Sequence, residues 1–178
     1  YNLSTPYDIS THTYAGDDER CDLDVEAGAA NVDPKTTGDL AISTDGLKVF
    51  FLRRSTNGAN PDMDRLYRYD LTTPYDISTC YYVEDINPDT DALALGSTAV
   101  GDRGDFTRNH VQGVEINPAG TKIFLTFNDA SGTTDGVKEF SLSKPFDITT
   151  MSLVKSAGIS LETAANDNPD AIFFGLNG

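Results

Sequence analysis

Oxygen-bearing side chains at alternate positions give the sequence its clearest candidate for metal chemistry. The stretch DINPDTDALALG places Asp85, Asn87, Asp89 and Asp91 two residues apart, which is the ligand spacing in the first half of a calcium loop. A threonine and a glycine stand where an EF-hand loop has its glycine at position six and its acidic ligand at position twelve. Two interpretations therefore stand: calcium is the one cofactor that the sequence suggests, or these residues form a solvated acidic turn.

Residue types that perform catalysis are scarce. The two histidines, His12 and His110, have no partner at the spacing of metal ligands. No serine lies in the Gly-x-Ser-x-Gly pattern of a nucleophile elbow. With 28 acidic residues in the chain, carboxylate pairs arise anywhere and do not indicate a glycosidase. We predict that the chain has no catalytic residues and is not an enzyme.

The charge balance argues against some classes of binding partner. Thirteen basic residues stand against 28 acidic residues, for a net charge of −15. Such a chain repels phosphate backbones and anionic lipids, so we expect no nucleic-acid partner. No apolar run approaches the roughly 20 residues that span a bilayer, so we expect no membrane insertion.

Two cysteines leave the redox state open. Cys21 and Cys80 either form a disulfide or remain unpaired thiols that pack as small apolar residues. If oxidised, they close a long loop and stabilise the fold by roughly 4 kcal/mol in the chain-entropy model.

An eleven-residue stretch occurs three times, and it indicates the strands and turns that position the candidate residues. The copies are YNLSTPYDIST from Tyr1, YDLTTPYDIST from Tyr69 and FSLSKPFDITT from Phe140. In each copy a proline ends a strand, because proline cannot donate to a ladder, and the aspartate two residues later caps a turn. The repeated pairs are Pro6 and Asp8, Pro74 and Asp76, and Pro145 and Asp147.

A second landmark lies between these copies. GDLAISTDGLKVFFL (38–52) corresponds to GVEINPAGTKIFLTF (113–127), and AIFFGLNG (171–178) begins a third copy. An alternating strand leads to a tight turn that needs glycine at positive φ, and a nearly continuous apolar strand follows. The turn glycines are Gly46, Gly120 and Gly178. With the strands before and after each proline, every unit has four short antiparallel strands.

These units resemble the WD-repeat-like, YVTN-type β-propeller repeats of bacterial surface and phage structural proteins, in which SPDGTKMFV leads to YxYDLSTPYDIST. The resemblance implies an all-β fold of four-stranded antiparallel blades. The predicted units are 1–37 (the end of one blade plus an insertion), 38–112, 113–169, and 170–178 as the first strand of a further blade. Roughly 2.5–3 blades are too few to close a propeller, so the chain is expected to be an oligomer or part of a longer chain.

The resemblance implies a non-catalytic module of an extracellular, cell-surface or virion protein that acts in adhesion, recognition or assembly. Its expected partner is a protein, a glycan or another copy of the chain. An alternative is a self-assembling ring or filament subunit completed by strand exchange between copies. A propeller enzyme of the lactonase or lyase type ranks last, because its site needs ligands from several blades.

Overall fold

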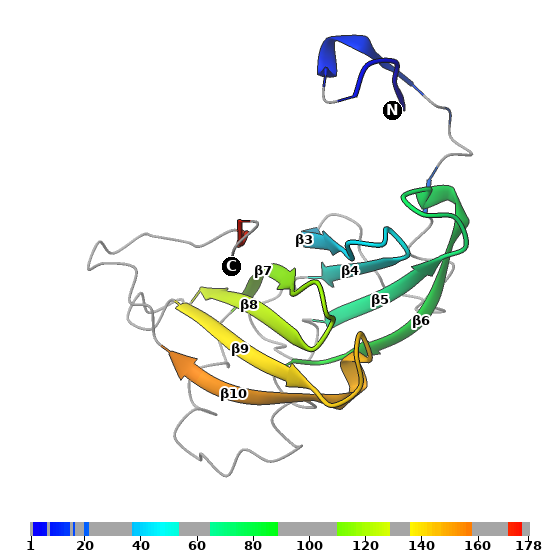
Figure 1. The fold of residues 1–178 in the computed structure, drawn as a ribbon. Coiled ribbons are helices and arrows are strands. Elements are labelled where there is room, and N and C mark those ends of the chain that lie inside the picture. The colour runs from blue at the N-terminus through cyan, green and yellow to red at the C-terminus, as the bar shows by residue number, and fades with distance from the viewer. Residues whose placement is uncertain are drawn as a thin grey trace, which may run out of the picture.

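The computed structural model describes residues 2–6, 8–14, 16, 20–21, 37–53, 65–88, 110–128, 136–157 and 171–175. Every strand pairing is antiparallel, and the helical elements in the described part are short 3₁₀ turns (Figure 1). The strands are β1 (Asn2–Leu3), β2 (His12–Thr13), β3 (Thr37–Ile42), β4 (Lys48–Arg53), β5 (Arg65–Leu71), β6 (Cys80–Ile86), β7 (His110–Ile116), β8 (Lys122–Asn128), β9 (Gly136–Leu142) and β10 (Met151–Ala157). The 3₁₀ turns are η1 (Ile9–Thr11), η4 (Ile77–Thr79) and η7 (Ile148–Thr150).

Two four-stranded antiparallel sheets form the body of the molecule (Figure 1). The first sheet has the strand order β3-β4-β5-β6, and the second sheet has the order β7-β8-β9-β10. The hairpin of β1 and β2 lies apart from both sheets and carries the first copy of the repeated stretch. The all-β prediction and the four strands of each complete repeat are therefore confirmed.

The second strand of the first sheet shows why its sequence is apolar at consecutive positions. In β4 the residues Val49 to Leu52 are all buried. Phe50 and Leu52 pack toward the second sheet, whereas Val49 and Phe51 belong to a separate cluster on the opposite face. A strand covered on both faces has no solvent side on which to alternate with polar residues.

The two sheets pack against each other through one apolar core. Phe50, Leu52 and Leu66 of the first sheet have no exposed surface in this core. The core comprises Ala41, Phe50, Leu52, Leu66 and Ile86 from the first sheet, and Val111, Val114, Ile116, Ile123, Leu125, Phe140, Leu142, Ile148 and Met151 from the second sheet and its corner. Because burial of a large apolar side chain contributes about 1.5–3 kcal/mol, this shared core holds the two repeats together.

The sheets correspond strand by strand. A one-residue irregularity interrupts the pairing of the first two strands at the same place in each sheet. The matched registers make Leu40 and Ile42 of β3 equivalent to Val114 and Ile116 of β7. The inner strands β3 and β7 also lie side by side: a Cβ added at Gly38 would be 3.1 Å from the carbonyl oxygen of Gln112.

The prediction that 170–178 begins with a strand is wrong over the described residues 171–175, which form no strand. A strand needs a ladder partner for its backbone groups, and no described strand pairs with this segment. The predicted start of the third unit at residue 113 is also late, since β7 begins at His110. The described residues form two packed sheets and no closed ring of sheets.

The 171–175 segment nevertheless lies against the second sheet. A Cβ added at Gly113 would be 2.9 Å from the Cα of Ala171, and the ring of Phe174 lies 4.6 Å from that of Phe124 between centroids. The backbone of this segment therefore approaches β7 closely, on the face of the second sheet that carries Phe124.

Candidate functional site

The repeated stretch folds into the same corner in each copy. We call residues 72–79 the first-sheet corner and residues 143–150 the second-sheet corner. Asp76 caps η4 by accepting hydrogen bonds from the backbone N–H of Ser78 at 3.2 Å and from its hydroxyl at 2.6 Å. Asp147 makes the equivalent bonds to Thr149, and Asp8 makes them to Ser10 in the N-terminal hairpin. The predicted capping role of all three aspartates is confirmed.

The two sequence landmarks meet in space at each complete corner. Tyr75 has φ of 61° and Phe146 has φ of 64°, which is the left-handed region. The Tyr75 N–H donates to the carbonyl of Gly46 at 2.8 Å, and the Phe146 N–H donates to that of Gly120 at 2.7 Å. Each ring covers its glycine, because an added Cβ at Gly46 or Gly120 would lie 2.5 Å from a ring carbon. The glycines are therefore required both by the turn and by the aromatic residue above it.

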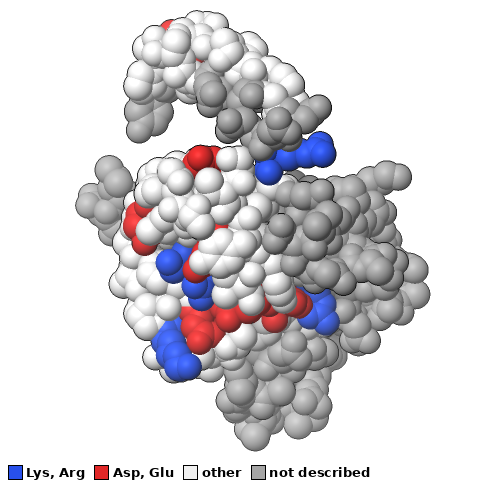
Figure 2. Space-filling model, turned by 90° about the vertical axis from the view of Figure 1, so that its right-hand side faces the viewer, with Lys and Arg blue, Asp and Glu red and all other residues white. Residues whose placement is uncertain are grey.

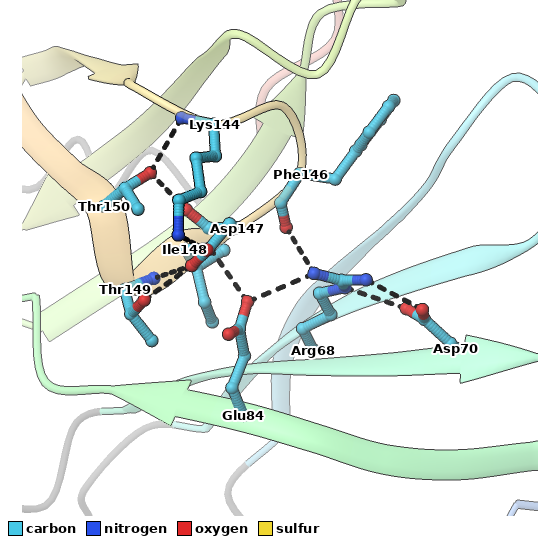
Figure 3. A network of polar contacts seen from close by, with 9 residues as sticks. All are labelled: Arg68, Asp70, Glu84, Lys144, Phe146, Asp147, Ile148, Thr149 and Thr150. Carbon is cyan, nitrogen blue, oxygen red and sulfur yellow. Dashed lines mark hydrogen bonds and ion pairs between the residues drawn. The ribbon is translucent and has the colours of Figure 1, made fainter.

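The second-sheet corner docks onto the first sheet through a polar network (Figure 3). Arg68 on β5 donates to both carboxylate oxygens of Asp70, at 2.8 and 2.7 Å, and to the backbone carbonyl of Phe146 at 3.0 Å. Glu84 on β6 accepts from the backbone N–H of Ile148 at 2.9 Å and lies 3.3 Å from Arg68. Two backbone groups of the corner are thus satisfied by charged side chains of the neighbouring repeat, and such bonds are stronger than neutral ones.

Burial shapes the titration of this network. Burial raises the pKa of the Glu84 carboxyl, an effect that the Ile148 N–H and the Arg68 guanidinium oppose and the Asp147 charge adds to. Burial alone would lower the pKa of Arg68, but hydrogen bonds with Asp70 and the charges of Asp70 and Glu84 outweigh it and raise that pKa. Arg68 therefore stays charged in the network.

Apolar contacts surround the network. Ile148 has no exposed surface, and Phe146 stacks on Phe50 with ring centroids 6.4 Å apart and planes inclined by 23°. The ammonium group of Lys48 lies 5.3 Å from the Phe146 ring centroid, within cation–π range. The arrangement is therefore that of a packed interface between repeats.

The first-sheet corner has the same local structure, but no other described element docks on it as the first sheet docks on the second-sheet corner. Tyr75 is 65% exposed and Ile77 is 44% exposed. The Tyr75 hydroxyl donates to the carbonyl of Thr44 at 2.7 Å. Within the described residues no group accepts from the Ile77 N–H, whose counterpart at Ile148 is bonded to Glu84.

The cysteines form a disulfide, which resolves the open alternatives. Cys21 and Cys80 are joined with a Cα–Cα distance of 5.7 Å, and both pack against the buried apolar cluster on the face of the first sheet that points away from the second sheet. Disulfides persist in oxidising compartments. Among the described residues, no helix is long and apolar enough to cross a membrane.

The candidate calcium loop is described only in part. Asp85 uses both carboxylate oxygens within the first sheet, one toward Arg65 and one toward the Tyr82 hydroxyl. Burial and the hydrogen bond to Asp85 raise the pKa of Tyr82 to about 12. Asn87 is buried, whereas Asp89 and Asp91 lie outside the described residues. In the described part no three His, Cys, Asp or Glu side chains are grouped as metal ligands, and the calcium site stays a prediction.

The remaining predicted residues can be placed briefly. Each corner has its proline at an exposed turn position, namely Pro6, Pro74 and Pro145. Gly46 and Gly120 have the predicted positive φ, at 68° and 65°, whereas Gly178 lies outside the described residues.

Arg68 and Glu84 were not among the residues predicted from the sequence. The register of the second sheet places Glu139 and Lys155 at their positions, so a comparison of the copies shows no shared residue there. One signal was available in the sequence. The third strand has a basic residue and the fourth an acidic residue in the first sheet, whereas the second sheet has Glu139 on the third strand and Lys155 on the fourth.

On the face shown in Figure 2, acidic and basic side chains lie next to one another. The described residues also form ion pairs, such as that between Arg68 and Asp70 at 2.7 Å. This face of the described residues presents no basic field for a phosphate backbone.

Comparisons with protein-family models, with curated protein sequences and with solved structures give no match to this chain.

Proposed function

We propose that the chain is a non-catalytic module of the β-propeller kind, in which four-stranded sheets stack as blades, and that it serves recognition, adhesion or assembly in an extracellular, cell-surface or virion protein. The observation that carries this proposal is the docking of one repeat's corner onto the preceding sheet. Arg68 and Glu84 bind backbone groups of Phe146 and Ile148 there. The charged groups at this junction are used to join repeats and not to face a substrate.

Three further observations support the proposal. The disulfide suits a secreted or surface location. The net charge of −15 keeps such a protein soluble and away from nucleic acids. The repeated units bury their faces against each other, as stacked repeats must.

A glycan array together with a turnover panel tests this function. The labelled chain is applied to the array, and unlabelled chain is assayed with lactones and polyuronates, each with calcium and with chelator. Binding without turnover supports a recognition module. Turnover that depends on calcium would instead favour the propeller enzyme.

One observation favours a second candidate, self-assembly. The first-sheet corner exposes apolar residues whose counterparts in the second sheet are covered. Sedimentation velocity across a hundredfold range of concentration measures it: a concentration-dependent mass that is lost in Ile77→Arg supports a ring or filament subunit.

A further inference from the structure

The face of the first sheet that points away from the second sheet brings the disulfide and several tyrosines together. Tyr67 and Tyr69 belong to the buried apolar cluster on this face. Tyr82, Cys21 and Cys80 pack against the same cluster. Because Tyr82 lies two residues after Cys80 in an unbroken stretch of β6, both side chains point to one face, with their Cα atoms about 7 Å apart. The phenol ring of Tyr82 is therefore a neighbour of the disulfide.

The hydroxyl of Tyr82 has a proton acceptor in place. It donates to one carboxylate oxygen of Asp85, and Arg65 binds the other oxygen. The guanidinium thus fixes the carboxylate in the orientation that receives the phenolic hydrogen. A tyrosine that loses one electron becomes a strong acid, and a base within hydrogen-bond reach can take the proton as the electron leaves. Tyr82 is therefore placed to lose an electron and a proton together.

The disulfide is the matching electron acceptor. A disulfide takes up a single electron, and its S–S bond is then weakened. A tyrosine that has absorbed ultraviolet light can supply that electron when the two groups are close. The chain has eight tyrosines and no tryptophan, so its tyrosines are the main absorbers of such light. The rings of Tyr69 and Tyr82 meet edge to face with centroids 5.9 Å apart, so excitation of Tyr69 can also reach Tyr82.

This combination of groups belongs to the first sheet and does not come with the repeat. The second sheet has other residue types at the three positions concerned. By register these are Met151 for Cys80, Leu153 for Tyr82 and Ser156 for Asp85. The strands of the repeat therefore form without an electron donor, a proton acceptor or a disulfide at these places.

We propose that Tyr82, Asp85 and the Cys21–Cys80 disulfide form a photochemical redox site. Ultraviolet excitation of Tyr82 transfers one electron to the disulfide while the phenolic proton moves to the Asp85 carboxylate. The products are a neutral tyrosyl radical, a protonated Asp85 and a disulfide radical anion, so no external oxidant or reductant is needed. A proton from the solvent then splits the radical anion into one thiol and one thiyl radical. The disulfide is consumed, so this is a modification site and not a catalytic one.

Irradiation in the absorption band of tyrosine, followed by thiol alkylation and mass spectrometry, tests the proposal. Alkylation at Cys21 or Cys80 should increase with the light dose and stay absent in the dark. Tyr82→Phe should lower the initial rate of thiol release to about a tenth, because it removes the tyrosine that has a positioned proton acceptor. Tyr81→Phe is the matched control, since it removes the same absorbance from a residue that pairs with Asp70 and whose side chain points to the other face of the sheet. This control should keep the wild-type rate.

A second variant separates proton transfer from packing. Asp85→Asn keeps an acceptor for the Tyr82 hydroxyl but removes the base, so thiol release should fall about tenfold although the tyrosine is still present. In the wild type, electron paramagnetic resonance of a sample irradiated while frozen should show a tyrosyl radical. That signal should be lost in Tyr82→Phe and kept in Tyr81→Phe.

Several results would overturn the proposal. They are no thiol release from the wild type, equal rates in Tyr82→Phe and Tyr81→Phe, or an unchanged rate in Asp85→Asn. Urea unfolding before irradiation checks that each variant is folded, and the comparison of the two tyrosine variants decides the matter if Asp85→Asn does not fold. None of these measurements involves glycan binding or turnover, so failure of this inference and failure of the proposed function are distinguishable.

Discussion

The first-sheet and second-sheet corners share a sequence pattern and a backbone, yet only the second buries its isoleucine against a neighbouring sheet. Each has an aspartate cap, a left-handed aromatic residue and a glycine beneath its ring. Ile148 is fully buried, whereas Ile77 is 44% exposed. The repeated residues therefore determine the shape of the corner, and the neighbouring sheet determines how much that corner contributes to stability. Substitutions made in pairs can separate these contributions.

The largest expected effect comes from the position where the two sheets differ in covalent structure. Replacing Cys21 and Cys80 by alanine opens a loop between residues 59 apart, which should lower the free energy of unfolding by about 4 kcal/mol in the chain-entropy model. Urea unfolding without reductant measures this change. A loss below about 1 kcal/mol would show that the disulfide adds little to the stability of the first sheet.

The buried and exposed isoleucines give the next effect. Ile148→Ala removes a fully buried side chain and should cost about 3 kcal/mol. Ile77→Ala, its matched control, should change stability by less than about 0.5 kcal/mol. Equal losses in the two variants, measured by urea unfolding, would contradict the structural difference between the corners.

The turn glycines should behave alike in both repeats. An alanine at Gly46 or Gly120 must adopt positive φ and place its Cβ 2.5 Å from an aromatic carbon. We expect about 2 kcal/mol of destabilisation in each variant, read from thermal unfolding. A large effect at one glycine alone would mean that the neighbouring sheet, and not the local turn, requires it.

A smaller effect depends on pH. Burial raises the pKa of Glu84, so the folded state holds this proton more tightly than the unfolded state. The contribution of Glu84 is fully present below its unfolded pKa of about 4.3 and is lost as pH rises through the higher folded value.

Glu84→Gln keeps an acceptor for the Ile148 N–H and should remove this dependence, a change below about 1 kcal/mol. Urea unfolding between about pH 4 and 7 tests it. The same pH slope in wild type and variant would assign the dependence to other carboxyls, of which Glu115 also has a pKa raised by burial.

The smallest effect is expected at Tyr75. Its exposed hydroxyl donates to the Thr44 carbonyl, and Phe146 lacks this group. Tyr75→Phe gives the first-sheet corner the chemistry of the second and should cost about 0.5 kcal/mol. A loss comparable with that of Ile148→Ala in the same unfolding assay would mean that the first-sheet corner depends on this hydroxyl.

Local features were predictable from the sequence because they depend on nearby residues. The positive φ at Gly46 and Gly120 follows from turn chemistry, and the Asp76 and Asp147 caps follow from side-chain bonds to backbone groups two residues away. The buried run in β4 follows from its unbroken apolar pattern. Each of these needs no knowledge of the rest of the fold.

Contacts between distant residues were not predictable in the same way. The Tyr75 ring reaches Gly46 only after three strands are in register. Arg68 and Glu84 act where one repeat packs against the next. A comparison of the copies does not reveal them, because the second sheet has other residues at these two positions. The strand expected in 171–175 does not form, because likeness to the repeated stretch supplies no ladder partner.

The disulfide also decides how the chain bears a pull on its ends. Tension passes from Cys21 directly to Cys80, so β3, β4 and β5 lie outside the loaded path. The bond withholds on the order of 200 Å of extended chain from stretching. Strands β3, β4 and β5 can thus remain paired under a force that extends the residues before Cys21 and after Cys80.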